Sequence, residues 1–524
     1  MLGTKRGSRW RWLALLPLGV LLFWHLGDRP LHHDEGVNGW FLEHLLRHGE
    51  YRYDPTNYHG PTLYFLEIPV VAAAWLAGGA GGALADAMSE ATLRAGTALA
   101  ALLVLAALLG AADLLGAWGA TAAALLLGTS CATLFFARDF IHETWLVLFT
   151  LLFVVAALRF ARSRRYPPAA VAAASFALAL ATKETFPLSV AALAAAAIGA
   201  ELAAALGGES RPGGWRSALA ALSRPLVGLG RRRCLGLAGI AAAIWLVFFS
   251  SFFTVPRGPL DALRAYLPWG REAVHSVHEK PAAYYLLTLL GPYEPALLLG
   301  ACLALGLGIL WRDRLALFFG LWWIGTLAIY SVIPYKTPWL AATLLLPAAV
   351  AAGRAVELLV EALGRGRRAR WLAAALLGLL AIVWLAALPR ALRVVYREWD
   401  DPRHPQVYAQ TVRGFRTLLT AIDQEASRRQ GRGTAIEVTA ASYWPLPFYL
   451  RGYSSVAYWG KVEGARLEAP LIVADGEQEG ELAPRLKGYV RSGFDLRPGV
   501  RLDLWSRPEP APANGPAPRD PGGR

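Results

Sequence analysis

The sequence predicts an α-helical polytopic membrane protein with a small α/β domain at its C-terminal end. Of the 524 residues, 55% are hydrophobic and 17% are charged, with a mean hydropathy of +0.37. A soluble chain of this length carries more charge. The arginines behind the net charge of +14 stand in short blocks between apolar segments. This distribution is typical of cytoplasmic loops and does not indicate a nucleic-acid partner.

The transmembrane helices are predicted from apolar segments of nearly bilayer length. A crossing needs about 20 mostly apolar residues, and about eleven segments of the chain approach that length. These segments are 10–27, 94–112, 117–136, 144–160, 168–182, 185–206, 235–253, 293–311, 315–333, 337–353 and 371–389. Segment 62–77 is shorter and contains Glu67 and Pro69. We therefore expect it to be a re-entrant or interfacial helix.

The basic blocks predict the orientation. The blocks are 159–165, the loop 211–233, 311–314 and 364–370. All of them fall in the cytoplasm with the N-terminus only if 62–77 does not cross, and the positive-inside rule favours that topology. The expected protein is therefore a multi-pass protein of the cytoplasmic (inner) membrane. Its loops 28–93, 137–143, around 183–184, 254–283 and 334–337, and everything after residue 390, are then expected outside.

The chain changes character after the last apolar segment, and this change predicts the domains. We expect a transmembrane domain over 1–390, with 28–93 as its first external loop, and an extracytoplasmic α/β domain over 391–506. In the latter, the pattern predicts a helix over about 404–428 and strands within 434–440, 455–459, 470–475 and 500–506. Residues 507–524 are rich in Pro and Gly and are expected to be disordered. A role of this domain in docking the acceptor is a hypothesis.

Ionisable and polar side chains gather at the predicted outer ends of the spans, whereas the inner ends carry mainly arginine. Charge at span ends is costly to bury, so such residues are candidates for function. Acids, bases and cations on one face indicate a site there. The residues are His32, His33, Asp34, Glu35, Tyr58, His59, Arg138, Asp139, His142, Glu143, Lys183, Glu184, Tyr335 and Lys336.

Each group also has a structural alternative. Asp34 could cap a helix that begins near Gly36, because acids suit helix N-termini. The residues around His59 could form a turn at Gly60-Pro61. Arg138 and Asp139 could be an interfacial ion pair. The lysines at 183 and 336 could anchor the chain at the membrane surface.

A metal site is a further alternative. His32, His33, His59 and His142, together with nearby carboxylates, could bind zinc or manganese. No H-E-x-x-H spacing is present, and the histidines come from separate loops. The sequence therefore predicts no certain cofactor and leaves a divalent metal open.

Five blocks in order resemble the membrane glycosyltransferases of the GT-C superfamily. The blocks are HHDE, YDPTNYHGPTLYF, FFARDFIHET, ATKET and IPYKTPWL, and they span residues 32 to 340. The chain resembles protein O-mannosyltransferases and the aminoarabinose transferases of lipid A. It is most similar to a bacterial and archaeal branch of PMT-like proteins described as flippase activity-associated. The segment YWPLPFYLRGYSSVAYWG in the tail also resembles this branch.

The resemblance implies a transferase for a hexosyl or pentosyl group. The donor would be a polyprenyl-phosphate-linked sugar held among membrane lipids. The acceptor would be a protein, lipid or glycan, and the transfer would be inverting and on the outer side of the membrane. Carried over by position, Asp34 matches the catalytic acidic residue of the first loop, and Glu35 would support it. His59 would lie near the donor phosphate. Asp139 or Glu143 would supply a second acidic position, and the departure ARDFIHET leaves open which residue there matters, His142 included.

The chemistry of such a transfer assigns roles to the remaining residues. A carboxylate must accept the proton of the acceptor hydroxyl, and Asp34 is the candidate general base. Cations must offset the charge that grows on the leaving phosphate. The candidates are Arg138, Lys183, His59 and, favoured among them, Lys336. His33, Tyr58, Tyr64, His142, Glu184, Tyr335 and Trp339 complete the expected substrate-binding residues, and the aromatic ones could instead line the membrane interface.

Two other functions compete with this prediction. A flippase or transporter of a lipid-linked sugar would also place charges among its spans. It should place them near the middle of the bilayer, often at broken helices in repeated halves. A catalytically silent accessory protein of a flippase system is the third alternative, although it would have no need for the Asp34-Glu35 pair.

Overall fold

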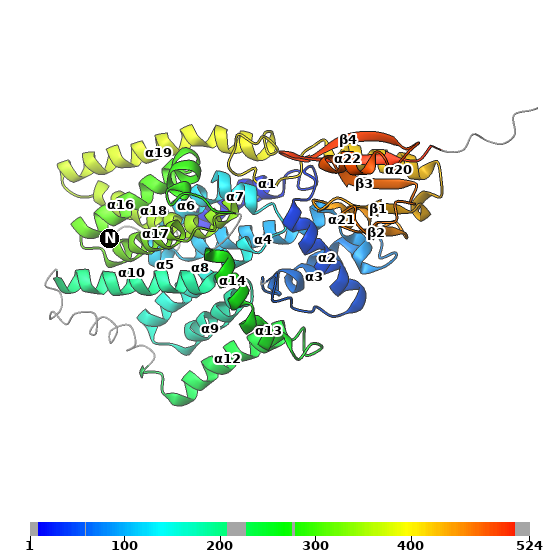
Figure 1. Cartoon of the computed structure of the whole chain (residues 1–524). Coiled ribbons are helices and arrows are strands. Elements are labelled where there is room, and N and C mark those ends of the chain that lie inside the picture. Colours follow the sequence, from blue (N-terminus) through cyan, green and yellow to red (C-terminus); the bar gives the residue numbers. More distant parts are fainter. Residues whose placement is uncertain (1–8, 58, 207–226, 275–277, 509–524) are drawn as a thin grey trace, which may run out of the picture. The chain divides into compact units, whose positions relative to one another are not determined.

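The computed structural model of the chain describes residues 9–57, 59–206, 227–274 and 278–508 (Figure 1). The chain forms two compact units. The first takes in Met1–Asp28 and Asn38–Tyr408, and the second takes in Arg29–Val37 and Ala409–Arg524. The second unit thus begins later than residue 391 and includes part of the first predicted loop. The candidate residue Tyr58 and most of the predicted disordered tail, 507–524, lie outside the described residues.

The first unit is a bundle of apolar helices. In the described part of the chain, seven helices are long and apolar enough to cross a membrane. They are α4 (Glu90–Gly110), α8 (Glu143–Ser163), α10 (Phe186–Leu206), α12 (Arg231–Phe249), α17 (Arg314–Val332), η4 with α18 (Pro338–Leu340 and Ala341–Leu363) and α19 (Arg367–Tyr396). An eighth span results if the bent pair Tyr284–Tyr293 and Pro295–Leu310, which meet at 109°, is one crossing. The predicted multi-pass helical fold is confirmed.

The other predicted crossings are helical but shorter. Segment 10–27 forms η1 (Arg9–Ala14) and α1 (Leu15–Phe23), and 168–182 forms α9 (Tyr166–Leu180). Segment 117–136 is divided into α6 (Ala117–Gly128) and α7 (Cys131–Phe136), because the Ser130 hydroxyl caps α7 by accepting the Thr133 N–H. The remaining helices of this unit are α2 (His33–His48), whose first residues belong to the second unit, α3 (Thr62–Ala77), η2 (Leu84–Ala87), α5 (Ala112–Leu115), α13 (Gly258–Arg264), α14 (Tyr266–Val274), η3 (Tyr284–Leu290), α15 (Gly291–Tyr293) and α16 (Pro295–Leu310).

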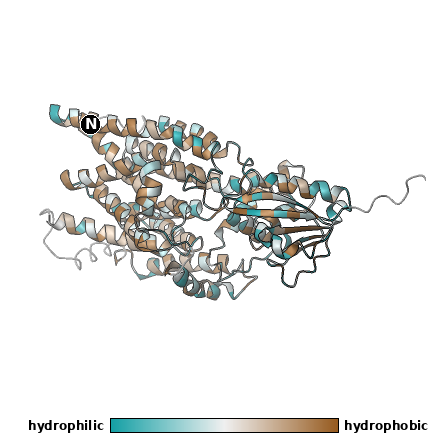
Figure 2. Ribbon diagram, turned by 45° about the horizontal axis from the view of Figure 1, so that its top comes forward, coloured by the Kyte–Doolittle hydropathy of each residue, from teal (hydrophilic) through white to brown (hydrophobic). Residues whose placement is uncertain are grey.

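The bundle has two chemically different ends. Helices α8, α9 and α10 follow one another through short connections, so the start of α8, the end of α9 and the start of α10 lie at one end. That end carries Glu143, Lys183 and Glu184. The other end carries the arginines that follow Phe160 and precede α17. Figure 2 shows apolar residues along most of the helices between these ends. This separation is what a bilayer demands of charged side chains.

Helices α6 and α18 approach closely at a pair of glycines. A Cβ built on Gly353 would lie 2.5 Å from the carbonyl oxygen of Gly119, and a Cβ on Gly119 would lie 2.5 Å from the oxygen of Gly353. Small residues allow such close helix packing in membrane proteins, where dispersion contacts replace the hydrophobic effect. The glycines therefore set the distance between the two helices.

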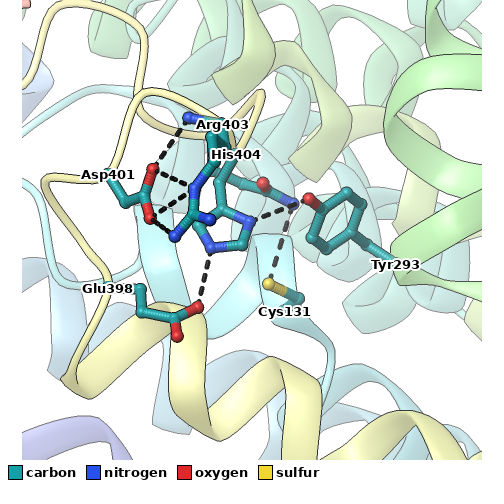
Figure 3. A network of polar contacts seen from close by, with 7 residues as sticks. Cys131, Tyr293, Glu398, Asp401, Arg403 and His404 are labelled. Atoms are coloured by element: carbon teal, nitrogen blue, oxygen red, sulfur yellow. Dashed lines mark hydrogen bonds and ion pairs between the residues drawn. The ribbon is translucent and has the colours of Figure 1, made fainter.

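Polar contacts hold the segment that follows α19, itself part of the first unit, against α15 and α7 (Figure 3). The Tyr293 hydroxyl lies 2.9 Å from Nδ1 of His404, whose Nε2 lies 2.8 Å from a carboxylate oxygen of Glu398. The side-chain amide of Gln406 donates to the Cys131 sulfur at 3.7 Å. The chain is thus fixed up to the boundary of the second unit.

The second unit contains one five-stranded sheet with the strand order β2-β1-β3-β5-β4. Strands β1 (Ile436–Val438), β2 (Val456–Tyr458) and β3 (Leu471–Asp475) are parallel, and β5 (Val500–Ser506) and β4 (Val490–Arg497) join in antiparallel register. One core forms where α20 (Phe415–Ser427) and α21 (Leu446–Leu450) pack on this sheet, around Phe415, Leu418, Val438, Leu471 and Leu504. The short helices are η5 (Gly431–Gly433), η6 (Gly476–Gln478) and α22 (Glu479–Leu482).

Sequence patterns predict four of these strands and miss β4. The residues of β4 are largely exposed, and the strand lies at the edge of the sheet, so it lacks the apolar alternation that marks a strand. The predicted helix over 404–428 begins only at Phe415, because residues before it form turns.

The glycine crossing yields the first prediction. Gly353→Ala should destabilise the protein by about 1–3 kcal/mol, because the added methyl group overpacks the contact with α6. Gly378→Ala is the matched control, since nothing lies within 4 Å of a Cβ at that position of α19. Thermal unfolding in detergent measures both. Equal unfolding midpoints for the two variants would contradict the close crossing.

Candidate functional site

Asp34 lies at the start of α2, in a segment that the second unit holds by hydrogen bonds. The Leu31 N–H donates to the Tyr449 hydroxyl at 2.8 Å, and the Thr411 hydroxyl donates to the Leu31 carbonyl at 2.7 Å. A Cβ on Gly36 would lie 2.6 Å from Cβ of Pro445, so only glycine permits this packing of the helix start. The segment is therefore built into the unit that contains the sheet.

The neighbours of Asp34 shape the first turn of α2. The buried Glu35 carboxylate accepts the backbone N–H of His32 at 2.8 Å, which satisfies a donor at the helix start. The Asp34 N–H donates to Nδ1 of His32 at 3.1 Å. Glu35 and His32 thus fix the backbone that carries Asp34. The helix begins at His33, earlier than the capping alternative expects, and the carboxylate that accepts the His32 N–H is that of Glu35.

Arg497, at the end of β4, is directed at this turn. Its Nη1 lies 3.2 Å from Nδ1 of His33, and its Nη2 lies 3.3 Å from the Trp444 carbonyl oxygen. Burial lowers the pKa of the Arg497 guanidinium, and the negative charges of Asp34 and Asp475 oppose that shift. A half-buried cation thus lies within electrostatic reach of the predicted base.

In the first unit, Lys183 and Glu143 form a buried ion pair. The Lys183 side chain is 4% exposed and that of Glu143 is 2% exposed. Burial lowers the pKa of the Lys183 ammonium, but Glu143 and Glu184 together outweigh this effect, and its pKa is raised above the usual value. Lys183 is therefore protonated at neutral pH and already has a counter-ion.

His59, His142 and Glu184 extend this pair into a polar cluster. Nδ1 of His59 lies 3.0 Å from a Glu184 carboxylate oxygen, and Nε2 of His142 lies 3.0 Å from the Gly60 carbonyl oxygen. The two imidazole rings are 5.0 Å apart. Burial, with help from the charges of His59 and Lys183, lowers the pKa of His142 well below its usual value. His142 is therefore neutral and donates or accepts as an imidazole.

The loop that carries His59 is docked by its backbone on the turn between α9 and α10. The Gly60 N–H donates to the Thr182 carbonyl at 3.0 Å, and the hydroxyls of Thr62 and Thr182 are 2.7 Å apart. A Cβ on Gly60 would lie 2.0 Å from the Ala181 carbonyl oxygen. The glycine predicted as part of a turn is thus required by close backbone contact.

The Tyr64 side chain faces the same region. Its hydroxyl donates to the Asn38 side chain at 3.0 Å, and its ring lies 5.7 Å from that of His142. A small cavity beside the cluster is lined by His59, Lys183, Glu184, Trp269, Tyr330 and Tyr335, among others. The structure thus brings together seven of the predicted residues: His59, Tyr64, His142, Glu143, Lys183, Glu184 and Tyr335.

Arg138 and Asp139 lie elsewhere in the first unit. The Arg138 guanidinium donates to four backbone carbonyls, those of Leu21, Leu22, Trp24 and His25, at 2.5 to 3.2 Å. It also lies 4.8 Å from the centre of the Tyr396 ring. Arg138 therefore caps the end of α1, which is a structural use of its charge. Asp139 is buried in the loop before α8.

Lys336 lies in a loop that pairs with residues 278–280. Its N–H donates to the His278 carbonyl at 3.1 Å, and Tyr335 forms an antiparallel bridge with Glu279. The Lys336 Nζ donates to the Ile333 carbonyl, and burial lowers the pKa of the ammonium. Trp339 follows in η4, with its ring 5.9 Å from that of Tyr408. Unlike Lys183, Lys336 has no carboxylate partner in the described part of the chain.

The structure also bears on the metal alternative. Among residues 9–57, 59–206, 227–274 and 278–508, no three or more His, Cys, Asp or Glu side chains converge as metal ligands would. Nδ1 of His32 accepts the Asp34 N–H, and Nδ1 of His33 faces Arg497. The hydrogen bonds of these nitrogens serve the start of α2.

Sequence reasoning missed Arg497. Its strand lacks the apolar pattern of a strand, and 464 residues separate it from His33. One signal was present, an arginine in a short run between Phe494 and Val500, but it does not differ from the many other arginines of the chain. Only the tertiary fold identifies it.

The chain shares its fold with solved structures of ArnT and AglB, which agrees with the fold that the resemblance predicts. Two solved structures illustrate it. ArnT from Cupriavidus metallidurans, determined with bound undecaprenyl phosphate, is similar over 95% of this chain and 98% of ArnT, with 17% identity and a TM-score of 0.59. The oligosaccharyltransferase AglB from Archaeoglobus fulgidus, in complex with an inhibitory peptide and a dolichol-phosphate, is similar over 93% of this chain and 73% of AglB, with 12% identity and a TM-score of 0.52.

At these identities the likeness establishes the fold. No protein-family model matches the chain, and no curated protein matches it. The resemblance to the PMT-like branch stays a prediction.

The buried pair yields the second prediction. Glu143→Gln should lower the free energy of unfolding by about 3–5 kcal/mol, because it removes the hydrogen-bonded counter-ion of the buried Lys183 ammonium and leaves only Glu184, which already faces His59, to offset that charge. The double variant Glu143→Gln/Lys183→Met should recover most of this loss. Thermal unfolding in detergent measures both variants. Glu463→Gln is the control, since its ion pair with Lys461 is exposed and should leave the midpoint unchanged. A single variant as stable as the wild type would contradict the pairing.

Proposed function

We propose that the chain is a membrane glycosyltransferase. It transfers a hexosyl or pentosyl group from a polyprenyl-phosphate donor to a protein, lipid or glycan acceptor on the outer face of the cytoplasmic membrane. The observation that carries this proposal is the fold match over 95% of the chain to ArnT, which was solved with undecaprenyl phosphate bound. AglB, solved with a dolichol-phosphate and a peptide, adds a second lipid-phosphate binder of this fold.

Asp34 is the proposed general base. An inverting transfer needs a carboxylate that takes the proton of the acceptor hydroxyl as the new glycosidic bond forms. The first turn of α2 is fixed by Glu35 and by glycine packing at position 36, which supports a positioned carboxylate. Arg497 favours the ionised form of Asp34 by its positive charge.

Lys336 is the proposed partner of the leaving phosphate. Lys183 is already neutralised by Glu143, whereas the Lys336 ammonium donates to a backbone carbonyl and retains a net charge to offer. A hydrogen bond from a charged donor to a phosphate is stronger than a hydrogen bond between neutral groups. The donor is then oriented by the polar side chains of Lys183, His59, His142 and Glu184. Arg138 has a structural role, because it holds the end of α1.

The transporter alternative has one observation that favours it, the bent helix pair with buried Glu294 at its break. The Glu294 carboxylate, however, accepts the Ala132 N–H at 2.8 Å and so satisfies the start of α7. That contact supports a structural role. Purified protein with a radiolabelled polyprenyl-phosphate sugar separates the functions: transfer supports the enzyme, movement of intact donor across vesicles supports the transporter, and neither supports the accessory.

The third prediction separates the base from the phosphate ligand. Asp34→Asn should lower sugar transfer by at least about 10²-fold, because it removes the proton acceptor, and should leave donor binding unchanged. Lys336→Ala should weaken donor binding by about tenfold or more, the value of one charged hydrogen bond. Transfer of radiolabelled sugar and binding of undecaprenyl phosphate measure the two effects.

Asp261→Asn is the control for the aspartate change, because Asp261 lies in an exposed ion pair with Arg264. Burial lowers the pKa of Lys336, so wild-type donor affinity should fall in alkaline solution, at a lower pH than an ordinary lysine would give, and Lys336→Arg should remove that fall. Full transfer by Asp34→Asn, or equal donor affinity in the aspartate and lysine variants, would overturn these assignments.

The fourth prediction concerns Arg497. Arg497→Gln should lower transfer by about tenfold or more and shift the acidic limb of its pH profile upwards, because the Asp34 carboxylate loses a nearby positive charge. Arg497→Lys should restore the pH profile in part. Arg466→Gln is the control, an exposed arginine of the same unit. An unchanged pH profile in Arg497→Gln would limit Arg497 to a structural role.

A further inference from the structure

A large apolar cavity lies in the first unit, apart from the polar cluster. Its volume is about 660 Å³, and it is lined by side chains of α8, α9, α10, α12 and α17. The lining is mostly alanine, leucine and phenylalanine, including Phe153, Phe176, Leu193 and Phe318. Sites for small ligands have volumes of about 300–1,000 Å³ and are mostly apolar. The cavity thus has the size and chemistry of a binding site.

The cavity belongs to the arginine-rich end of the bundle. Its lining comes from the second half of α8, residues 169–176 of α9, residues 190–201 of α10, Leu237 of α12 and the first turns of α17. Lys183 and Glu143 lie at the opposite ends of the same helices. The cavity is therefore separate from the residues that we assign to the donor phosphate.

Three charged residues stand at the edge of the cavity: Arg164, Arg314 and Glu201. Arg164 follows the last residue of α8 and is exposed, and Arg314 is the exposed first residue of α17. Their sum is one positive charge, and the exposed Arg162 and Arg165 add to it. An apolar chamber with a cationic edge is complementary to an acyl chain that ends in an anionic head group.

We propose that this cavity binds an anionic phospholipid of the phosphatidylglycerol type. One acyl chain fills the chamber, and the phosphate accepts hydrogen bonds from the guanidinium groups of Arg164 and Arg314. Guanidinium pairs with phosphate through two parallel hydrogen bonds, which makes arginine suited to this role. Glu201 accepts a hydrogen bond from a hydroxyl of the glycerol head group. Basic pockets between transmembrane helices bind anionic lipid head groups by the same physics.

Native mass spectrometry of the full chain tests this site directly. Purified protein in detergent is mixed with equal amounts of phosphatidylglycerol and phosphatidylcholine that carry identical acyl chains. The wild type should retain phosphatidylglycerol about tenfold better, the value of one charged hydrogen bond. Arg164→Gln/Arg314→Gln should abolish that preference.

Two further variants make the result specific. Arg367→Gln/Arg368→Gln removes the same charge from exposed residues at the start of α19 and should keep the preference. Ala197→Phe fills the chamber while the arginines stay, and should lower retention of both lipids at the site. Equal retention of the two lipids by the wild type overturns the proposal, as does an unchanged preference in Arg164→Gln/Arg314→Gln. Equal loss in the α19 control also overturns it, because it would indicate general attraction to a basic surface.

Discussion

The buried ion pair between Lys183 and Glu143 is the contact on which the polar end of the bundle depends. Each charge offsets much of the desolvation cost of the other, which for an unpaired buried ion is several kcal/mol. The pair joins the start of α8 to the turn between α9 and α10, and Gly60 docks the His59 loop on the same turn. The ion pair and the Gly60 contact thus join three segments that are distant in sequence at this end of the bundle.

The same pairing distinguishes residues that look alike in the sequence. Lys183, Lys336 and Arg138 are all cations at predicted span ends. In the structure the first is neutralised by Glu143 and the third caps α1 through backbone carbonyls. Of the three cations, Lys336 is the one whose side chain donates to a backbone carbonyl of its own loop, that of Ile333. A cation that is already neutralised by a carboxylate binds a phosphate weakly. The proposed roles of Lys183, Arg138 and Lys336 therefore differ because their partners differ, although all three are cations.

The sequence predicts the membrane part of the fold well because the signal is local. Each crossing is visible in its own composition, and each predicted segment overlaps a helix. The capping of α7 by Ser130 and the edge strand β4 were not predictable in this way. The break between α6 and α7 depends on the hydroxyl group of one residue, Ser130. An exposed strand at the edge of a sheet, such as β4, does not need alternating apolar and polar residues. The pairing of His59 with Glu184 also lies beyond local pattern, since 125 residues separate them.

The position of Asp34 changes how the C-terminal region should be studied. Residues Arg29–Val37 belong to the unit that contains the sheet, and the rest of α2 belongs to the helical unit. Deletion of the C-terminal region would remove the Tyr449 hydroxyl, Thr411 and Arg497, which are partners of this segment. The backbone that carries the proposed base would lose its hydrogen bonds. A truncated protein without activity therefore says nothing about acceptor docking, and only point variants on surfaces of this unit away from α2 can address that hypothesis.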